Sequence, residues 1–212
     1  MREAFRAGKD IHAETAAFAF DVPPEQVTRE QRRAAKTLNF GVLYGMGPQA
    51  FARAAGMSLG EAQAFIDEYM RTYRGIAEYM EEAAALAASH GYVETMYGRR
   101  RYLPEIRSNN PQIRSAAERM AINHPIQGTE SDIIKRAMVV LYERMEGGDQ
   151  VFGNVKMILQ VHDELVFEVP TGQAEKFAQE VKNIMERMEK LSVPIIVDVR
   201  SGKNWGEMRD VS

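Results

Sequence analysis

Two short capping patterns restrict this chain more than any other feature, because each fixes where a long helix begins. In a capping box, a Ser or Thr side chain accepts a hydrogen bond from the backbone N–H three residues later. A Glu or Gln at that later position accepts in return from the backbone N–H of the Ser or Thr. Thr28–Gln31 and Ser58–Glu61 both fit this pattern. Apolar residues at helical spacing follow each box, so we expect one helix over about 29–44 and helix over 59–90, interrupted near Gly75.

The remaining elements are predicted from apolar spacing and from the positions of Gly and Pro. We expect helices over about 10–20, 112–123, 129–145 and 173–191, β-hairpins over about 92–103 and 157–169, a last strand over 195–199 and a tail over 201–212. Pro125 and Gly128 should break the helical run between 112 and 145, because proline removes a backbone donor and clashes with the preceding turn. The predicted fold class is α+β, rich in helix, with a small antiparallel sheet.

Composition excludes several protein classes. The chain has 212 residues, 45% of them hydrophobic, and no cysteine. The apolar fraction is too high for a disordered protein, the length suits one or two domains, and the missing cysteine excludes disulfides and thiolate metal ligands. No apolar run approaches the roughly 20 residues of a membrane helix, and no signal peptide opens the chain. We therefore expect a soluble, cytoplasmic protein with no membrane partner.

Basic residues gather in two places although the net charge is −3. Residues 28–36 contain four basic residues against one acidic, and residues 99–119 contain six Arg against two Glu. Local basic patches on a mildly acidic chain favour a polyanionic partner. Ordinary solvated helix faces are the equally weighted alternative.

Four residues of the 29–44 helix form a row that we call the cation–aromatic stripe: Arg32, Lys36, Phe40 and Tyr44. Each step of four residues advances about 40° around a helix, so the row winds gently over about 18 Å. Cations at one end and flat rings at the other suit the phosphates, sugar and base of a nucleotide. A stripe that is half solvated and half core is the more common alternative. His12, in the first turn of its helix, could contact a phosphate, although a surface role is more common there.

Two further groups of polar residues could contact nucleic acid or metal. Arg119, Asn123 and Gln127 are spaced four apart and could follow a nucleic-acid backbone or groove, if the helix continues past Pro125. His162–Glu164 lie at the tip of the second hairpin, where carboxylates could bind Mg²⁺ for two-metal phosphoryl transfer. Turns favour Asp, so simple solvent exposure is the alternative. One such hairpin cannot hold two ions unaided.

The order of these motifs along the chain resembles that of family A DNA polymerases. Residues 32–45, Arg-Arg-Ala-Ala-Lys-Thr-Leu-Asn-Phe-Gly-Val-Leu-Tyr-Gly, resemble motif B of that family, and Gln160–Glu164 resembles motif C. Asp10–His12, Gly98–Pro104 and Gln127–Thr129 fall in the family's order, so the resemblance covers essentially the whole chain. It implies fingers helices plus a small antiparallel palm sheet, with fingers over 1–90 and a partial palm over 91–212.

The resemblance also implies a role for each matching residue. His12, Arg32 and Lys36 would grip the triphosphate, Phe40 would pack on the sugar, and Tyr44 would sit against the template base. Arg119, Asn123, Gln127 and His162 would lie at or near the primer-template DNA. Asp163 would be a metal ligand for Mg²⁺ with Glu164 in support, and Lys36 would assist catalysis.

One part of the family's pattern is absent from the sequence. The family's second metal-binding Asp belongs to motif A, upstream of Asp10–His12, and residues 1–9 contain no Asp. The chain thus resembles a C-terminal piece of a polymerase, either natural, split or excised. Without the motif A strand the second hairpin should expose an unpaired edge and apolar surface, inviting self-association or the missing N-terminal segment as partner.

The sequence therefore predicts part of a DNA-directed DNA polymerase that adds deoxynucleotides to a primer 3′-hydroxyl in replication or repair. The isolated chain is expected to be weakly active or inactive. The main alternative is a non-catalytic nucleotide or nucleic-acid binder or a split-polymerase subunit. A more distant one is a metal-dependent phosphohydrolase using His162, Asp163 and Glu164.

Overall fold

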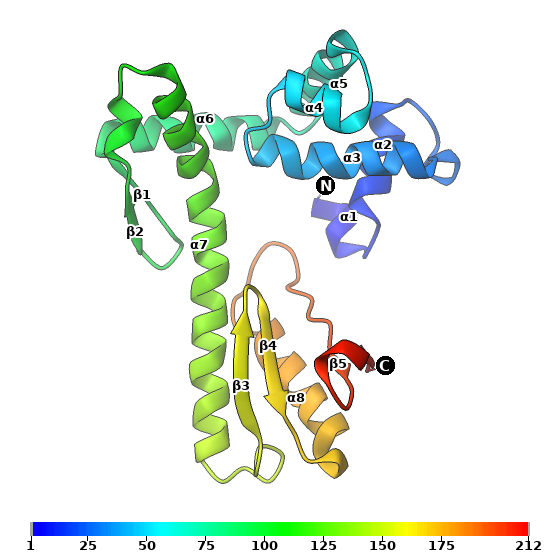
Figure 1. The fold of residues 1–212 in the computed structure, drawn as a ribbon, viewed down its shortest axis with the longest axis vertical. Helices are drawn as coiled ribbons and strands as arrows, with labels where there is room; N and C mark the ends of the chain where they lie inside the picture. Colours follow the sequence, from blue (N-terminus) through cyan, green and yellow to red (C-terminus); the bar gives the residue numbers. More distant parts are fainter. Residues whose placement is uncertain (1, 212) are drawn as a thin grey trace. The chain divides into compact units, whose positions relative to one another are not determined.

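The computed structural model describes residues 2–211, and of Leu43 only the backbone. It is rich in helix and contains small antiparallel sheets (Figure 1), as the sequence predicts. The helices are α1 (Arg2–Arg6), α2 (Ile11–Ala19), α3 (Arg29–Leu43), α4 (Pro48–Ala55), α5 (Leu59–Thr72), α6 (Arg74–His90), α7 (Pro111–Glu146) and α8 (Ala174–Glu186). The strands are β1 (Tyr92–Glu94), β2 (Arg100–Tyr102), β3 (Lys156–Val161), β4 (Glu164–Glu168), β5 (Arg200–Ser201) and β6 (Arg209–Asp210).

The chain forms two compact units, Met1–Thr129 and Glu130–Ser212, with α7 running from one into the other. The functional division near residue 90 into fingers and palm stays a prediction. Among the described helices, none is both long enough and apolar enough to cross a lipid bilayer.

Both capping boxes form as predicted. The Thr28 hydroxyl accepts from the Gln31 N–H at 3.2 Å, and the Gln31 side chain accepts from the Thr28 N–H at 2.9 Å. Ser58 and Glu61 make the same reciprocal pair at the start of α5. The predicted interruption near Gly75 is also present, since α5 ends and α6 begins around Tyr73.

The first core of the N-terminal unit packs α3 against α4 and α5. Its buried members include Leu38, Phe51, Phe65 and Tyr69. The sequence pattern does not predict α4, because Gly45–Pro48 indicates only the end of a helix. Proline is well suited to the first helical position, and here Pro48 opens an eight-residue helix that buries Phe51.

The first hairpin packs on a second core formed with α6 and α7. β1 and β2 form the predicted hairpin and pair antiparallel, with Tyr92 opposite Tyr102. Gly98 has a φ of +78°, which glycine adopts freely in a turn. Val93 and Leu103 are buried beneath the hairpin.

The predicted break at Pro125 and Gly128 is wrong, because α7 is one continuous helix of 36 residues. The Thr129 hydroxyl donates to the Pro125 carbonyl at 2.5 Å, and the Met96 N–H donates to the Thr129 hydroxyl at 3.0 Å. A Cβ on Gly128 would lie 2.6 Å from Thr95 Cγ2, so the glycine allows the β1–β2 turn to approach α7. Tertiary contacts thus override the local preference to break the helix.

The C-terminal unit places the β3–β4 hairpin and α8 around a separate core. Leu141 and Phe152 are fully buried there with Phe177 and Val181. The hairpin matches the predicted range, with Val161 opposite Glu164 at its tip.

Two C-terminal predictions are wrong. α8 ends at Glu186 rather than near residue 191, and residues 195–199 form no strand. The Val197 N–H instead donates to the Glu186 side chain at 3.1 Å, so a helix side chain takes the place of a strand partner. The short β5–β6 pair joins Arg200–Ser201 to Arg209–Asp210, largely within the predicted tail.

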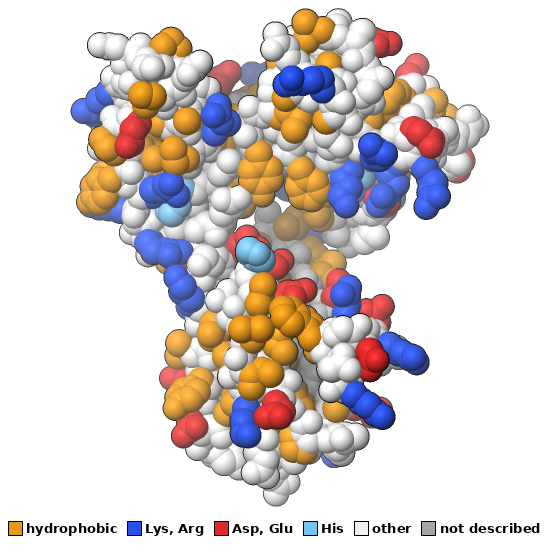
Figure 2. Space-filling model, viewed as in Figure 1, with side chains coloured by type: hydrophobic (Ala, Val, Ile, Leu, Met, Phe, Trp, Pro, Cys, Tyr) orange, Lys and Arg blue, Asp and Glu red, His pale blue; other side chains and the backbone are white. Residues whose placement is uncertain are grey.

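The exposed apolar surface predicted for the second hairpin is present. β3 and β4 pair only with each other among the described strands. Ile158 is 57% exposed and Leu159 is 42% exposed. Figure 2 shows hydrophobic side chains gathered over this hairpin.

Leu141→Ala should destabilise the C-terminal unit by about 2–5 kcal/mol, because it empties a fully buried site. The matched control is Tyr142→Ala on the next residue of α7, which is 57% exposed and should cost far less. Urea unfolding followed by circular dichroism measures both. Equal losses for the two variants would contradict the assignment of this core.

Candidate nucleotide and nucleic-acid site

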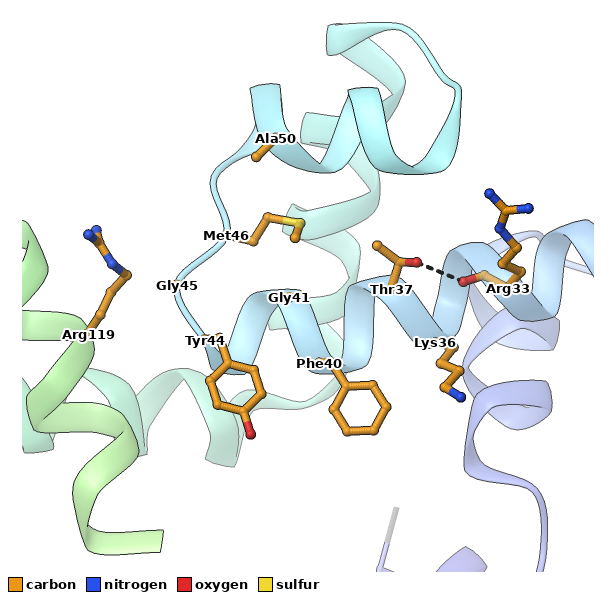
Figure 3. A pocket seen from close by; sticks show the side chains of 10 residues that line it. All are labelled: Arg33, Lys36, Thr37, Phe40, Gly41, Tyr44, Gly45, Met46, Ala50 and Arg119. Atoms are coloured by element: carbon orange, nitrogen blue, oxygen red, sulfur yellow. Dashed lines mark hydrogen bonds between the residues drawn. The ribbon is translucent and has the colours of Figure 1, made fainter. Parts of the chain in front are cut away.

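The cation–aromatic stripe lies on the exposed side of α3. Phe40 is 49% exposed and Tyr44 is 47% exposed, whereas Leu38 and Val42 are buried on the opposite side. Figure 3 shows Lys36, Phe40 and Tyr44 projecting from the same side of the helix. The rings are therefore not core residues, and the half-core alternative does not hold. In Figure 2, Lys and Arg side chains lie beside exposed hydrophobic ones over this helix.

A pocket of about 590 Å³ opens along α3 (Figure 3). Its lining comes from α3, the turn after it, α4 and α7: Arg33, Lys36, Thr37, Phe40, Gly41, Tyr44, Gly45, Met46, Ala50 and Arg119. This volume lies within the range of small-molecule sites, about 300–1,000 Å³. The lining combines apolar groups with the cations Arg33, Lys36 and Arg119, a combination that suits a flat ring carrying an anionic group.

Two glycines allow the pocket-lining side chains of Met46 and Arg119 to pack close to the end of α3. A Cβ on Gly41 would lie 2.8 Å from Met46 Sδ. Gly45 has a φ of +74°, and a Cβ there would lie 2.5 Å from Arg119 Cδ. Gly45 therefore supplies both a left-handed turn and the space that the Arg119 side chain crosses.

Asp10 joins the start of α2 to α3. Its carboxylate accepts from the N–H groups of His12 and Ala13 at 3.0 and 3.1 Å. The same carboxylate accepts from Arg32 Nε at 2.6 Å. The hydrogen bond from Arg32 holds the pKa of Asp10 below its ordinary value, with the two backbone N–H groups adding to the effect.

His12 lies beside the stripe as predicted. Its ring centroid is 5.5 Å from that of Phe40. Burial lowers the pKa of His12 below its ordinary value. The negative charge of Asp10 opposes this shift in the pKa, and the positive charges of Arg32 and Lys36 add to it.

The row of Arg119, Asn123 and Gln127 lies on one continuous helix, because α7 does not break at Pro125. Arg119 also lines the pocket on α3, and its Nη1 donates to the Ser115 hydroxyl at 2.9 Å. Asn123 and Gln127 do not line that pocket. Their contact with DNA stays a prediction.

The tip of the β3–β4 hairpin exposes the other predicted site residues. His162 and Asp163 form the turn, His162 with a φ of +51°, and Glu164 begins β4. The Gln160 side-chain amide donates to the His162 carbonyl at 2.6 Å and tightens the turn. All three side chains at the tip are exposed.

The hairpin tip does not by itself fit a metal site. Among residues 2–211 no group of three or more His, Asp or Glu side chains could hold an ion. Mg²⁺ takes six oxygen ligands, of which a protein commonly supplies one or two carboxylates while water and substrate phosphates supply the rest. The phosphohydrolase alternative, which needs His162, Asp163 and Glu164 around one ion, has no support in this arrangement.

The sequence analysis missed two residues that shape the site, Thr15 and Asn39. Both are buried, at 1% and 5% exposure, between α2 and α3. The available signal was an Asn in the interior of a predicted helix, where it has poor intrinsic preference. Such a residue calls for a specific hydrogen-bond partner.

The family is established by comparison with known proteins. The model of DNA polymerase family A matches residues 1–207, so the chain belongs to that family. Members of this family use divalent metal ions. The predicted membership of this family is thereby confirmed, and the role of each site residue stays a prediction.

Bacterial DNA polymerases are among the similar proteins. DNA polymerase I of Pseudomonas aeruginosa is 46% identical over 207 residues, which are 98% of this chain and 22% of that protein. The thermostable DNA polymerase I of Thermus aquaticus is 45% identical over 201 residues, 95% of this chain and 24% of that protein. The chain therefore spans about a quarter of the length of these relatives.

A solved structure has the same fold over most of the chain. It is the POL domain of Pol1 from M. smegmatis in complex with DNA primer-template and dNTP. The sequence identity is 39%, the TM-score is 0.84, and the match covers 91% of this chain and 34% of that one.

Gly45→Ala should cost more stability than Gly56→Ala. Both glycines have positive φ, and the strain of a side chain there is about 1–2 kcal/mol. Only at Gly45 would the new Cβ also displace the Arg119 side chain, since nothing lies within 4 Å of a Cβ at Gly56. Thermal unfolding of the two variants measures the difference. Equal losses would show that Arg119 does not pack on Gly45.

Proposed function

We propose that this chain provides the nucleotide-binding part of a template-directed DNA polymerase. The observation that carries the proposal is the exposed cation–aromatic stripe beside the start of α2. In this reading Arg32, Lys36 and His12 bind the triphosphate of a deoxynucleoside triphosphate. Phe40 packs on its sugar, and Tyr44 lies against the template base. Fingers over 1–90 and a partial palm over 91–212 belong to the same proposal.

The electrostatics of the stripe support a triphosphate. Arg32 and Lys36 are both exposed cations on one helix. Charge-assisted hydrogen bonds to phosphate are roughly twice as strong as neutral ones. The aromatic rings that follow along α3 offer apolar faces for the uncharged part of the nucleotide. A row that was basic throughout would suit a polymer backbone instead.

The proposed reaction is attack of a primer 3′-hydroxyl on the nucleotide with release of pyrophosphate. Asp163, with Glu164 in support, is the part of this chain that we assign to Mg²⁺. These two residues alone do not make a complete metal site. Arg119, Asn123, Gln127 and His162 are proposed to contact primer-template DNA.

Lys36→Ala should weaken binding of a deoxynucleoside triphosphate by about ten-fold or more, since a charge-assisted hydrogen bond contributes about 1.5–3 kcal/mol. Lys135→Ala removes another exposed lysine, on α7, and is the matched control. Titration of the 212-residue chain with a fluorescent nucleotide measures both affinities. Unchanged affinity in Lys36→Ala would refute the proposed triphosphate site.

Primer extension by this chain alone should be far below an ordinary polymerase rate, because its described carboxylates form no metal-binding group. The assay uses primer-template DNA, the four nucleotides and Mg²⁺, with and without an added N-terminal part of the polymerase region of a relative. Restored extension in the mixture would support a split enzyme. Binding without restored extension would favour the alternative of a non-catalytic nucleotide binder.

A further inference from the structure

The two carboxylate oxygens of Asp10 make two different kinds of contact. Oδ1 accepts from the backbone N–H groups of His12 and Ala13 at 3.0 and 3.1 Å and thereby caps the start of α2. Oδ2 accepts from Arg32 Nε on α3 at 2.6 Å. Because the helix cap and the contact with Arg32 use different atoms, a substitution can remove one and keep the other.

The contact through Nε leaves the outer edge of the Arg32 guanidinium available. An arginine has five N–H donors, of which Nε carries one and the two Nη atoms carry the other four. Within residues 2–211, neither Nη group of Arg32 donates a hydrogen bond to another residue. The Arg32 side chain is 46% exposed. Two neighbouring N–H groups of this kind match two oxygens of one phosphate group.

The contact also restricts the orientation of the guanidinium. Asp10 Oδ1 is held by the first turn of α2, so Oδ2 is an acceptor of fixed direction. Arginine has a long side chain with much conformational freedom, and ordering it on binding reduces affinity. An Arg32 side chain that is already held through Nε loses less of this freedom when an anion binds.

The charge of Asp10 also offsets a repulsion within α3. Arg32 and Lys36 are four residues apart and both exposed, and like charges at this spacing repel each other. The carboxylate of Asp10 is ion-paired with Arg32. The pair therefore allows two cations to lie on one side of the helix in the absence of a bound anion.

We propose that Asp10 is a positioning residue that holds Arg32 through Nε and so presents the two Nη groups to a phosphate of a nucleoside triphosphate. The ligand in this proposal rests on the proposed function. Asp10 acts only through Arg32, because a carboxylate in direct contact with phosphate would repel it.

Positioning and simple charge predict opposite results when the carboxylate is removed. If Asp10 acted only by its charge, it would weaken the binding of an anion, and neutralising it would raise the affinity. If Asp10 positions Arg32, neutralising it should lower the affinity although the site becomes more positive. The sign of the change therefore separates the two roles.

Asp10→Asn makes this test, because Asn caps a helix about as well as Asp. Asn has a single side-chain oxygen, which the cap uses, so its NH₂ group faces Arg32 Nε and two donors meet. Calorimetric titration of the 212-residue chain with inorganic triphosphate measures the affinity. It should fall by about three-fold or more, because the arginine must now be ordered on binding. An unchanged or raised affinity would overturn the proposal.

Two controls show whether the effect passes through Arg32. In an Arg32→Ala background no guanidinium remains to be positioned, so adding Asp10→Asn should leave the affinity unchanged or raise it. Glu94→Gln is the matched control on β1, where Glu94 accepts from Arg100 Nε at 2.7 Å, and it should not lower the affinity. An equal fall on adding Asp10→Asn with and without Arg32 would contradict the assigned role.

Asp10→Ser is a second variant with the same expected result. Its hydroxyl can cap α2, but serine ends one atom short of the position of Oδ2 and does not reach Arg32. Thermal unfolding followed by circular dichroism checks that both variants remain folded. Full triphosphate affinity in a folded Asp10→Ser chain would refute the positioning role.

Nuclear magnetic resonance tests the contact without any ligand. In the ¹⁵N-labelled chain, the Arg32 Nε–H signal is identified by its absence in Arg32→Lys. It should exchange slowly with water in the unchanged chain and quickly in Asp10→Asn, and fast exchange in both would overturn the proposal. If the unchanged chain does not bind triphosphate, the proposed function and the role of Arg32 toward phosphate are both refuted. Slow exchange would in that case still show that Asp10 holds Arg32.

Discussion

The attachment of α2 to α3 is the constraint on which the candidate site depends. Asp10 bonds the first turn of α2 to Arg32, and the buried pair of Thr15 and Asn39 bonds the next turn to the middle of α3. His12 lies between these two attachments and against Phe40. Two helices that are separate in sequence therefore present their polar and aromatic groups as one surface. A helix held at a single point could rotate and separate them.

The sequence predicted those parts of the fold that depend on residues within about four positions of each other. The Thr28 and Ser58 capping boxes and the cation–aromatic stripe are of this kind. The continuity of α7 through Pro125 depends on Thr95 and Met96 of another element, which local spacing does not encode. Residues 195–199 have the apolar alternation of a strand, and alternation alone cannot tell whether a partner strand is available.

The predicted parts of the candidate site also depend on residues that lie close together in the sequence. The exposed row on α3 follows from helical spacing, and His12 follows from the predicted start of its helix. Asn39 and Thr15 were not found, because their partnership across α2 and α3 depends on how two helices pack. The position of Asp163 at an exposed hairpin tip was predicted from the sequence. A metal site needs ligands from more than one element, and the described residues near this tip do not form such a group.

The left-handed turn at Gly45 has a mechanical consequence for the end of α3. The Arg119 side chain passes through the space that any other residue's Cβ would fill, so the last turn of α3 and the rotamer of Arg119 are interlocked. Tyr44 immediately precedes this point. A rotation of the Tyr44 ring that changes the Gly45 backbone must therefore also move the Arg119 side chain on α7. Movement of an aromatic ring in the pocket lining is thereby coupled to movement of a guanidinium group in the same lining.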